Sequence, residues 1–504
     1  MKFSVIPSLF LLTAFIYGLL IDAFAQKTDS LSDRNKTDLT ISMTRIGTIK
    51  PRYTTDIAGS NWLIGCETLD RDFADYDQYK GYLVPLGIKR LRLQAGWDKT
   101  ERVKGQYDWA WLDHIVDDAT KRGLKPWLQA SYGNHNYPNG GGSNLGAGMP
   151  TSPEALAAWD HWVTAMVTRY KNKVTDWEIW NEPNFADNPD NTPERTAALT
   201  IRTLDIIKRI QPEAKVSGLA MGHTDLDYAD AFFRIMAQKG KLKLLDAITY
   251  HDYVYNPDSN YPKTMQLRAL LDQYAPKLPL RQGENGAPSV PGYGRGALGN
   301  YEWSELTQAK WDLRRMLGDL GHDIESSVFT IIDIAYTGGP ITRLNAKGLI
   351  ASDSTKRAIK PKMAYYAVQN VAAIFDHSLR RIQAMKPSHN RSTVPNDADE
   401  VRYVTGTDRS VSVYGYRHKN SRKQAFTIWM DDHIPVESNK THNLTLTFAN
   451  ANFDQPVYVD ILSGRVYNIP LTQWKKNGAI YTFIDVPVYD SPVLIADKSL
   501  IQMQ

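Results

Sequence analysis

The segment of the chain best suited to chemistry is a short run that ends in an amide and a carboxyl group. Residues 174–184 read Val-Thr-Asp-Trp-Glu-Ile-Trp-Asn-Glu-Pro-Asn. The alternating apolar residues predict a strand, and Pro183 stops its ladder, so Asn181 and Glu182 fall where the strand meets the next loop. In α/β barrels that edge carries the chemistry. Asn181 and Glu182 are therefore the first candidate site residues.

The run Trp-Asn-Glu-Pro-Asn at residues 180–184 resembles the acid/base motif of the retaining glycoside hydrolases of clan A, which include families 39 and 5. The resemblance implies that Glu182 is the general acid/base. It also implies that Asn181 binds the 2-hydroxyl of the sugar at the cleavage point. One alternative stays open, a helix-capping Asn beside a solvated Glu, because Asn-Glu-Pro also occurs by chance.

A retaining glycosidase needs a second carboxylate, and Glu284 in the turn Gly-Glu-Asn-Gly can supply it. Glu284 follows Glu182 by roughly 100 residues, the length of about three strand-and-helix units. That spacing fits strands four and seven, which lie nearly opposite each other across a closed barrel. The resemblance makes the strand-seven Glu the nucleophile. Taken without this spacing, Glu284 reads as a polar turn residue.

Arg92 is a candidate partner of the nucleophile. Residues 89–94, Lys-Arg-Leu-Arg-Leu-Gln, alternate polar and apolar residues, and a barrel interior would receive one of the two sets. The resemblance implies that Arg92 hydrogen-bonds the nucleophile and keeps it ionised. A structural ion pair of an interior Arg is the alternative. Gln94 stands where family 39-like sequences often carry His, a departure from the pattern.

His251 and Tyr253, in Tyr-His-Asp-Tyr at 250–253, resemble the strand-six aromatic pair that orients the nucleophile and touches the sugar. A core histidine satisfied by a hydrogen bond is the alternative for His251. No His or Cys lies two to five residues beyond it, so the sequence predicts no metal site and no cofactor. Many clan A enzymes place a Trp on strand eight, and here Tyr336 is expected to substitute. The expected pocket walls are Trp97, Tyr132, Asn134, Trp180 and Tyr336.

Short apolar runs alternate with amphipathic helices over residues 62–376, which predicts an α/β fold with a closed parallel (β/α)8 barrel. The expected strands cover residues 62–66, 88–94, 125–130, 174–180, 214–220, 245–250, 278–283 and 328–334. After residue 376 short alternating runs predict an antiparallel β-sandwich. It reads either as a packed accessory domain or as an independent carbohydrate-binding module. The expected organisation is a signal peptide at 1–25, a leader at 26–61 that could add a sandwich strand, the catalytic barrel at 62–376, a linker at 377–400 and the sandwich at 401–504.

Composition excludes some function classes. The chain has 504 residues, 42% of them hydrophobic, and a net charge of +4 without a basic run, so it has no footprint for nucleic acid. Residues 1–25 carry Lys2, an apolar stretch and a small-x-small site, which predicts export to the periplasm or the medium and no stable membrane insertion after cleavage. An uncleaved membrane anchor is the alternative. Cys66 is the single cysteine, so no internal disulfide forms, and the oligomeric state is not indicated.

The sequence therefore predicts a retaining glycoside hydrolase that acts by double displacement on a plant or microbial oligo- or polysaccharide. Long Gly-rich loops on one rim tend to close a cleft into a pocket, which slightly favours exo action. The alternatives are an endo-acting glycanase of the same clan, an inverting hydrolase and a non-catalytic carbohydrate-binding barrel. The carboxylate separation distinguishes the two mechanisms, since retention needs about 5–5.5 Å and inversion about 6.5–9.5 Å.

Overall fold

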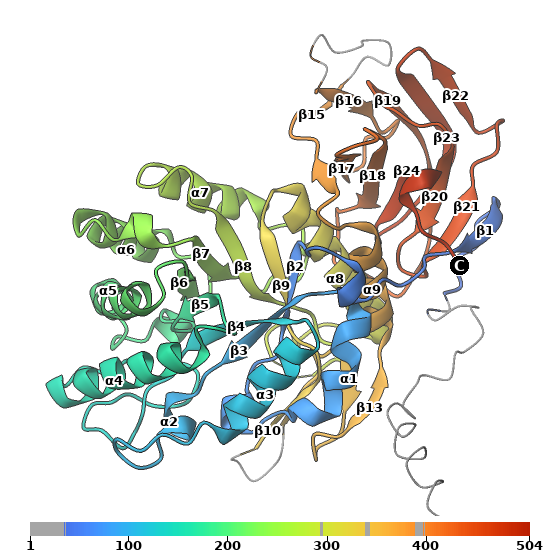
Figure 1. Ribbon diagram of the computed structural model, residues 1–504. Coiled ribbons are helices and arrows are strands. Elements are labelled where there is room, and N and C mark those ends of the chain that lie inside the picture. The colour runs from blue at the N-terminus through green and yellow to red at the C-terminus, as the bar shows by residue number, and fades with distance from the viewer. Residues whose placement is uncertain (1–34, 36, 293–295, 338–342, 389–396, 398) are drawn as a thin grey trace, which may run out of the picture.

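A computed structural model describes residues 35, 37–292, 296–337, 343–388, 397 and 399–504. It contains a closed parallel barrel and, in the C-terminal region, two sheets that are antiparallel except for one parallel pair of strands (Figure 1). The predicted fold class, a (β/α)8 barrel followed by a β-sandwich, is confirmed. The predicted signal peptide at 1–25 lies outside the described residues. No helix in the described part of the chain is both long and apolar enough to cross a membrane.

The barrel strands are parallel to their neighbours all round the closed sheet. They are β2 (Trp62–Gly65), β3 (Arg90–Gln94), β4 (Lys125–Ala130), β5 (Asp176–Ile179), β6 (Lys215–Met221), β7 (Ala247–His251), β8 (Leu280–Asn285) and β9 (Glu325–Val328). The eighth strand differs from expectation, because residues 325–328 and not the apolar run 328–334 close the barrel. Its inner residues are polar, so an apolar pattern could not locate it.

Several of the helices that cover the barrel start at polar side-chain caps. Ser152 and Thr192 cap α4 and α5, and each is followed by a proline at the first helical position, where a missing N–H costs nothing. The helices are α1 (Tyr76–Leu86), α2 (Trp97–Thr100), α3 (Ala110–Lys121), α4 (Pro153–Tyr170), α5 (Pro193–Ile210), α6 (Leu226–Gln238), α7 (Tyr261–Asp272), α8 (Glu305–Gly321) and α9 (Met363–Ile374).

The barrel interior is polar at the level of β3. Leu91 and Leu93 belong to the apolar core, whereas Arg90 pairs with Glu325 of β9 and Arg92 pairs with Glu178 of β5. Because β2 and β4 separate β3 from these strands, the pairs cross the inside of the barrel. The polar set of the alternating run 89–94 therefore faces inward, which places Arg92 inside the barrel.

The sandwich consists of a seven-stranded sheet in the order β1-β21-β20-β24-β18-β17-β14 and a five-stranded sheet in the order β15-β16-β19-β23-β22. Their bounds are β1 (Thr44–Thr48), β14 (Leu379–Arg381), β15 (Met385–Pro387), β16 (Val401–Val404), β17 (Val411–His418), β18 (Gln424–Met430), β19 (His442–Ala449), β20 (Pro456–Asp460), β21 (Arg465–Asn468), β22 (Trp474–Asn477), β23 (Ile480–Val488) and β24 (Val493–Asp497).

Two segments outside 401–504 contribute strands to this sandwich. β1, from the leader, pairs antiparallel with β21. The stretch 377–400, expected as a linker, supplies β14 and β15, which pair with β17 and β16. Both are three-residue edge strands, and edges accept polar residues and proline that a central strand excludes. The polar composition therefore concealed them. Two short hairpins, β10 (Ile334–Tyr336) with β11 (Arg343–Asn345) and β12 (Ile350–Ser352) with β13 (Ala358–Pro361), lie between β9 and α9.

The sandwich packs on the barrel through α8 (Figure 1). Lys310 on this helix donates hydrogen bonds to Asp490 Oδ1 at 2.7 Å and to the backbone carbonyls of Val436 and Ser438. Arg314 donates to the carbonyl of His433 at 2.9 Å. Both cations are buried, and buried charges need such partners. The sandwich is thus a packed part of the structure.

Candidate active site

Glu182 lies three residues beyond the end of β5, in a turn with unusual backbone dihedral angles. Trp180 has φ of +64° and Glu182 has φ of +46°, a region that side-chain-bearing residues seldom adopt. The Glu182 N–H donates to the carbonyl of Ala220 at 2.8 Å, which ties the turn to the end of β6. The tight turn places Glu182 at the carboxyl end of the barrel.

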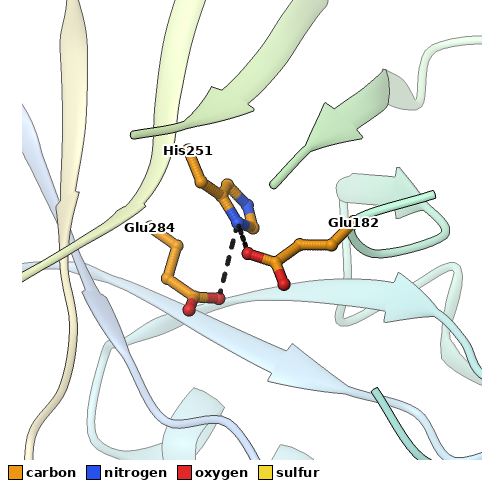
Figure 2. A group of neighbouring side chains, drawn as sticks. All are labelled: Glu182, His251 and Glu284. Carbon is orange, nitrogen blue, oxygen red and sulfur yellow. Dashed lines mark hydrogen bonds and ion pairs between the residues drawn. The ribbon is translucent and has the colours of Figure 1, made fainter. Parts of the chain in front are cut away.

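Two glutamates and a histidine converge at this end (Figure 2). His251, the last residue of β7, lies with Nδ1 2.7 Å from Glu182 Oε1 and 3.8 Å from Oε2 of Glu284, which is in β8. One ligand atom of each of the three residues lies within 4.8 Å of the others. The two carboxyl groups, distant in the sequence, therefore share one small space with an imidazole between them.

Arg92 is the hydrogen-bond centre of the site. Its Nη1 donates to Glu284 Oε2 at 2.9 Å and to Glu67 Oε1 at 3.0 Å. Its Nε donates to Glu178 Oε2 at 2.8 Å, and its Nη2 donates to Asn181 Oδ1 at 2.8 Å. Arg92 and Glu178 are fully buried. One guanidinium thus holds three carboxyl groups and orients the amide beside Glu182.

These contacts shift the pKa values of Glu284 and His251. Burial opposes the charge of Glu284, but His251 and Arg92 outweigh it and hold the pKa of this carboxyl below its usual range. Burial also opposes the charge of His251, whereas Glu284 and the hydrogen bond to Glu182 raise the pKa of its imidazole. Glu284 is therefore kept as an ion, which is the state that a nucleophile needs.

Three further residues expected at the site contact it directly. The hydroxyl of Tyr253 donates to Glu284 Oε1 at 2.7 Å. Asn181 Nδ2 donates to the hydroxyl of Tyr132 at 2.7 Å, and the Tyr132 ring packs edge-on against Trp180 with centroids 5.8 Å apart. The structure thus brings these residues together around the glutamates.

Gln94, at the position where His was expected from the resemblance, has a defined role in the packing. Its Oε1 accepts hydrogen bonds from the backbone N–H of Thr68 at 3.0 Å and from Arg71 Nη2 at 2.7 Å. The guanidinium of Arg71 lies over the Tyr132 ring, 5.0 Å from its centroid. Gln94 therefore fixes a cation against one wall of the site.

Trp97 and Asn134, expected as pocket walls, are used elsewhere. Trp97 is 0% exposed, stacks on Tyr137 and donates its indole N–H to Glu101. Asn134 Nδ2 donates to the backbone carbonyl of Glu101. Both residues brace the loop between β4 and α4, and neither offers a free face to a sugar. Their positions next to strand ends did not reveal that both side chains are buried, because loop packing decides which side chains enter a pocket.

Tyr336 lies in β10, beyond the barrel strand. Its hydroxyl accepts from Asn345 Nδ2 at 3.2 Å, and its ring meets Phe73 edge-on at 5.3 Å. Burial raises the pKa of its phenol, and the negative charges of Glu284 and Glu182 add to that rise. Tyr336 is thus close enough to sense both carboxylates.

Three further residues of the site were not predicted from the sequence: Glu67, Glu178 and Gln129. Glu67 comes two residues after β2, at the same edge as Glu182, but no motif surrounds it. Glu178 lies inside β5, where alternation with Trp177 could have predicted that it faces the barrel interior. Gln129 Nε2 donates to Glu178 Oε2 at 2.8 Å and to Asn181 Oδ1 at 3.1 Å. The site therefore has a second layer of polar support.

The spacing of Glu182, His251 and Glu284 would also suit ligands of a metal ion. However, a cation is already present, since Arg92 Nη1 donates to Glu284 and Nη2 lies 3.4 Å from His251 Nε2. Two carboxylates at this separation also match a paired acid and nucleophile. We interpret the cluster as acid–base machinery.

A cavity of about 480 Å³ opens next to these residues, although the two glutamates do not line it. Arg71 and Phe73 connect it to the site, since Arg71 covers Tyr132 and Phe73 touches Tyr336. The rest of its wall is polar: Asp70, Asp72, Asp98, Lys99, Arg102, His135, Asn136, Ser143 and Asn144. Such a wall suits a ligand rich in hydroxyl groups.

Residues 65–275 match the family model of glycosyl hydrolases family 39. Among solved structures, the chain is similar to a family 39 glycoside hydrolase from the gut symbiont Bacteroides cellulosilyticus WH2, with a TM-score of 0.62 and 18% identity over 89% of this chain and 83% of that one. It is also similar to a monomeric β-xylosidase from Caulobacter crescentus CB15, with a TM-score of 0.56 and 17% identity over 90% and 97%. No curated protein matches the chain.

A third similar structure is a family 51 α-L-arabinofuranosidase from Bifidobacterium longum, with a TM-score of 0.52 and 12% identity over 91% of this chain and 98% of that one. The family match, on a barrel that carries the paired glutamates, identifies the protein as an O-glycosyl hydrolase and confirms the resemblance to clan A. The matched range contains Glu182 and His251 and ends before Glu284.

Proposed function

We propose that this protein is a retaining glycoside hydrolase that works by double displacement, with Glu284 as the nucleophile and Glu182 as the acid/base. The observation that carries the proposal is the placement of one oxygen of each glutamate and a nitrogen of His251 within 4.8 Å of one another. An upper bound of 4.8 Å between these two oxygens fits a retaining pair, whose carboxyl groups lie ~5–5.5 Å apart, better than an inverting pair, which needs ~6.5–9.5 Å for its water.

The hydrogen bonds support this division of roles. Glu284 receives one hydrogen bond on each oxygen, from Tyr253 and from Arg92, which favours the carboxylate ion that attacks the anomeric carbon. Glu182 meets His251 but has no ion pair with Arg92, so it is free to give its proton to the leaving oxygen. In the second step Glu182 takes a proton from water, and that water displaces Glu284 from the sugar.

We infer an exo-acting enzyme on plant or microbial oligosaccharides. The loops between β4 and α4 (131–152) and between β8 and α8 (286–304) are long and follow the carboxyl ends of the strands. Loops there build the substrate site, and their length favours a pocket over an open groove. The likeness to a β-xylosidase makes aryl xylosides the first substrates to test. An endo-acting glycanase remains the rival outcome.

We also propose that the protein is exported, on the strength of the signal-like segment at residues 1–25. Expression of the full chain in a bacterial host, followed by N-terminal sequencing of the periplasmic or extracellular fraction, tests this. The expected mature chain starts at Gln26. An uncleaved chain in the membrane fraction would contradict export in soluble form.

The function is tested by hydrolysis of a panel of nitrophenyl glycosides and polysaccharides, followed by proton NMR of the first product formed. We expect release of one or two sugars from chain ends, with the product in the substrate's own anomeric configuration. Inverted product would contradict the double displacement. Release of long oligosaccharides from a polymer would instead identify an endo-acting enzyme of the same mechanism.

A further inference from the structure

Glu67 is a third carboxyl group in direct contact with the guanidinium that holds Glu284. Its Oε1 accepts from Arg92 Nη1 at 3.0 Å, and the same nitrogen donates to Glu284 Oε2 at 2.9 Å. The Nε of Arg92 donates to Glu178, and its Nη2 donates to Asn181. Glu67 and Glu284 therefore compete for one nitrogen of one cation.

The second oxygen of Glu67 has no such support. Glu67 is only 3% exposed, and its Oε2 has no hydrogen-bond partner among the described residues. A Cβ atom at Gly65 would lie 2.3 Å from this oxygen, so the carboxyl group packs directly on the glycine backbone. A buried, unpartnered carboxylate oxygen is costly. A proton on Oε2 removes that charge.

We propose that Glu67 holds a proton in the resting enzyme and acts, through Arg92, as a positioning residue for Glu284. Neutral Glu67 still accepts a hydrogen bond through Oε1 but leaves the charge of Arg92 to Glu284 and Glu178. An ionised Glu67 would draw Arg92 Nη1 away from Glu284. The catalytic part of this inference rests on the proposed role of Glu284 as the nucleophile.

The electrostatic surroundings of Glu67 agree with this assignment. Burial raises its pKa, Arg92 lowers it and Glu284 raises it again, to a value of about 8. Among the described residues, the cation Arg92 of β3 and the carboxyl group of Glu284 of β8 act most strongly on Glu67. Its charge is sensed in turn by the adjacent Cys66, by Tyr79 of α1 and by Tyr253 after β7. Burial raises the pKa of both the Cys66 thiol and the Tyr79 phenol, so both stay neutral.

The pH dependence of catalysis tests the positioning role. On an aryl glycoside whose leaving group needs no protonation, kcat/KM of the wild type should fall as Glu67 ionises near pH 8. Glu67→Gln cannot ionise and keeps an acceptor for Arg92, so this fall should disappear. Glu67→Ala should lose more kcat than Glu67→Gln at every pH, with KM less affected. Identical alkaline limbs in the wild type and Glu67→Gln would overturn the role.

A second measurement needs no substrate. Because the folded pKa of about 8 exceeds the ordinary 4.5, the folded wild type holds a proton that the unfolded chain has lost between these values. Wild-type stability therefore falls relative to Glu67→Gln as pH rises from about 5 to 8. The Tm of Glu67→Gln minus that of the wild type should grow over this range and then level off.

The matched control is Asp460→Asn, because Asp460 is a buried sandwich carboxyl whose pKa is also raised, mainly by burial. It should change the Tm series in the same direction and leave the pH profile of kcat/KM unaltered. A Tm difference for Glu67→Gln that stays flat from pH 5 to 8 would show an ionised Glu67 and overturn the proposal. A growing Tm difference in a protein without glycosidase activity would count against the proposed function and support the proton on Glu67.

Discussion

The hydroxyl of Tyr253 donates a 2.7 Å hydrogen bond to Glu284 Oε1, on the side of the carboxylate opposite to its contact with Arg92. Burial and the charge of Glu284 hold the pKa of this phenol well above its usual value, so Tyr253 keeps its proton and remains a donor. The carboxylate is thus gripped at both oxygens, by groups from β3 and from the loop after β7. These two hydrogen bonds fix the orientation of the carboxylate and favour its ionised form.

Tyr253→Phe should reduce kcat/KM by about 10- to 100-fold, since a hydrogen bond to a charged group contributes roughly 1.5–3 kcal/mol. The same bond lowers the pKa of Glu284. Its loss raises that pKa, so Glu284 is protonated over a wider range and the acid limb of the kcat/KM profile should move to higher pH. Tyr255→Phe, in the same loop, is the control. An acid limb that stays in place would contradict the assigned contact.

The residues of the site differ in how well the sequence predicts them. Glu182 carries a recognisable motif at the end of a strand pattern, and Glu284 is indicated by its spacing from Glu182, so residue order is enough to propose both. Glu67 occupies an equivalent strand end, but only the folded barrel places it on Arg92. Trp97 has the flat aromatic ring that a sugar platform needs, but stacking with Tyr137 buries this ring.

The same limit applies to the strands. Most of the barrel strands are apolar enough to be located by pattern. β9 carries polar residues toward the interior, and the edge strands β14 and β15 gain their structure from pairing with β17 and β16. Partners that lie elsewhere in the sequence decide these elements, and a local pattern cannot reveal them.

Lys310→Met should destabilise the whole protein, because it leaves Asp490 buried without its cation. The side chains of the pair are 0% and 3% exposed, and breaking such a pair costs about 3–5 kcal/mol. Calorimetry should show a lower Tm and a single transition, since α8 joins the barrel to the sandwich. Lys423→Met, which removes a pair with the largely exposed Asp454, is the control and should change stability by about 0–1 kcal/mol. Equal effects of the two variants would contradict the role of Lys310.

Chelation should not affect catalysis. Because Arg92 supplies the positive charge beside Glu284, dialysis against EDTA should leave kcat and KM unchanged. The measurement is the rate on the best aryl glycoside before and after dialysis, with a second sample resupplied with divalent cations. A loss of activity that these cations restore would assign the cluster of Glu182, His251 and Glu284 to metal binding.

Glu182 and Glu284 have different roles in the proposed mechanism, and azide rescue distinguishes these roles most directly. Glu182→Ala should keep the first step on an activated aryl glycoside, because that leaving group needs no proton, and added azide should accelerate turnover. The product should be a glycosyl azide with the substrate's own configuration. Glu284→Ala should lose turnover on every substrate. If azide instead rescues only Glu284→Ala, giving the inverted azide, while Glu182→Ala is inactive on aryl substrates, the two roles are assigned wrongly.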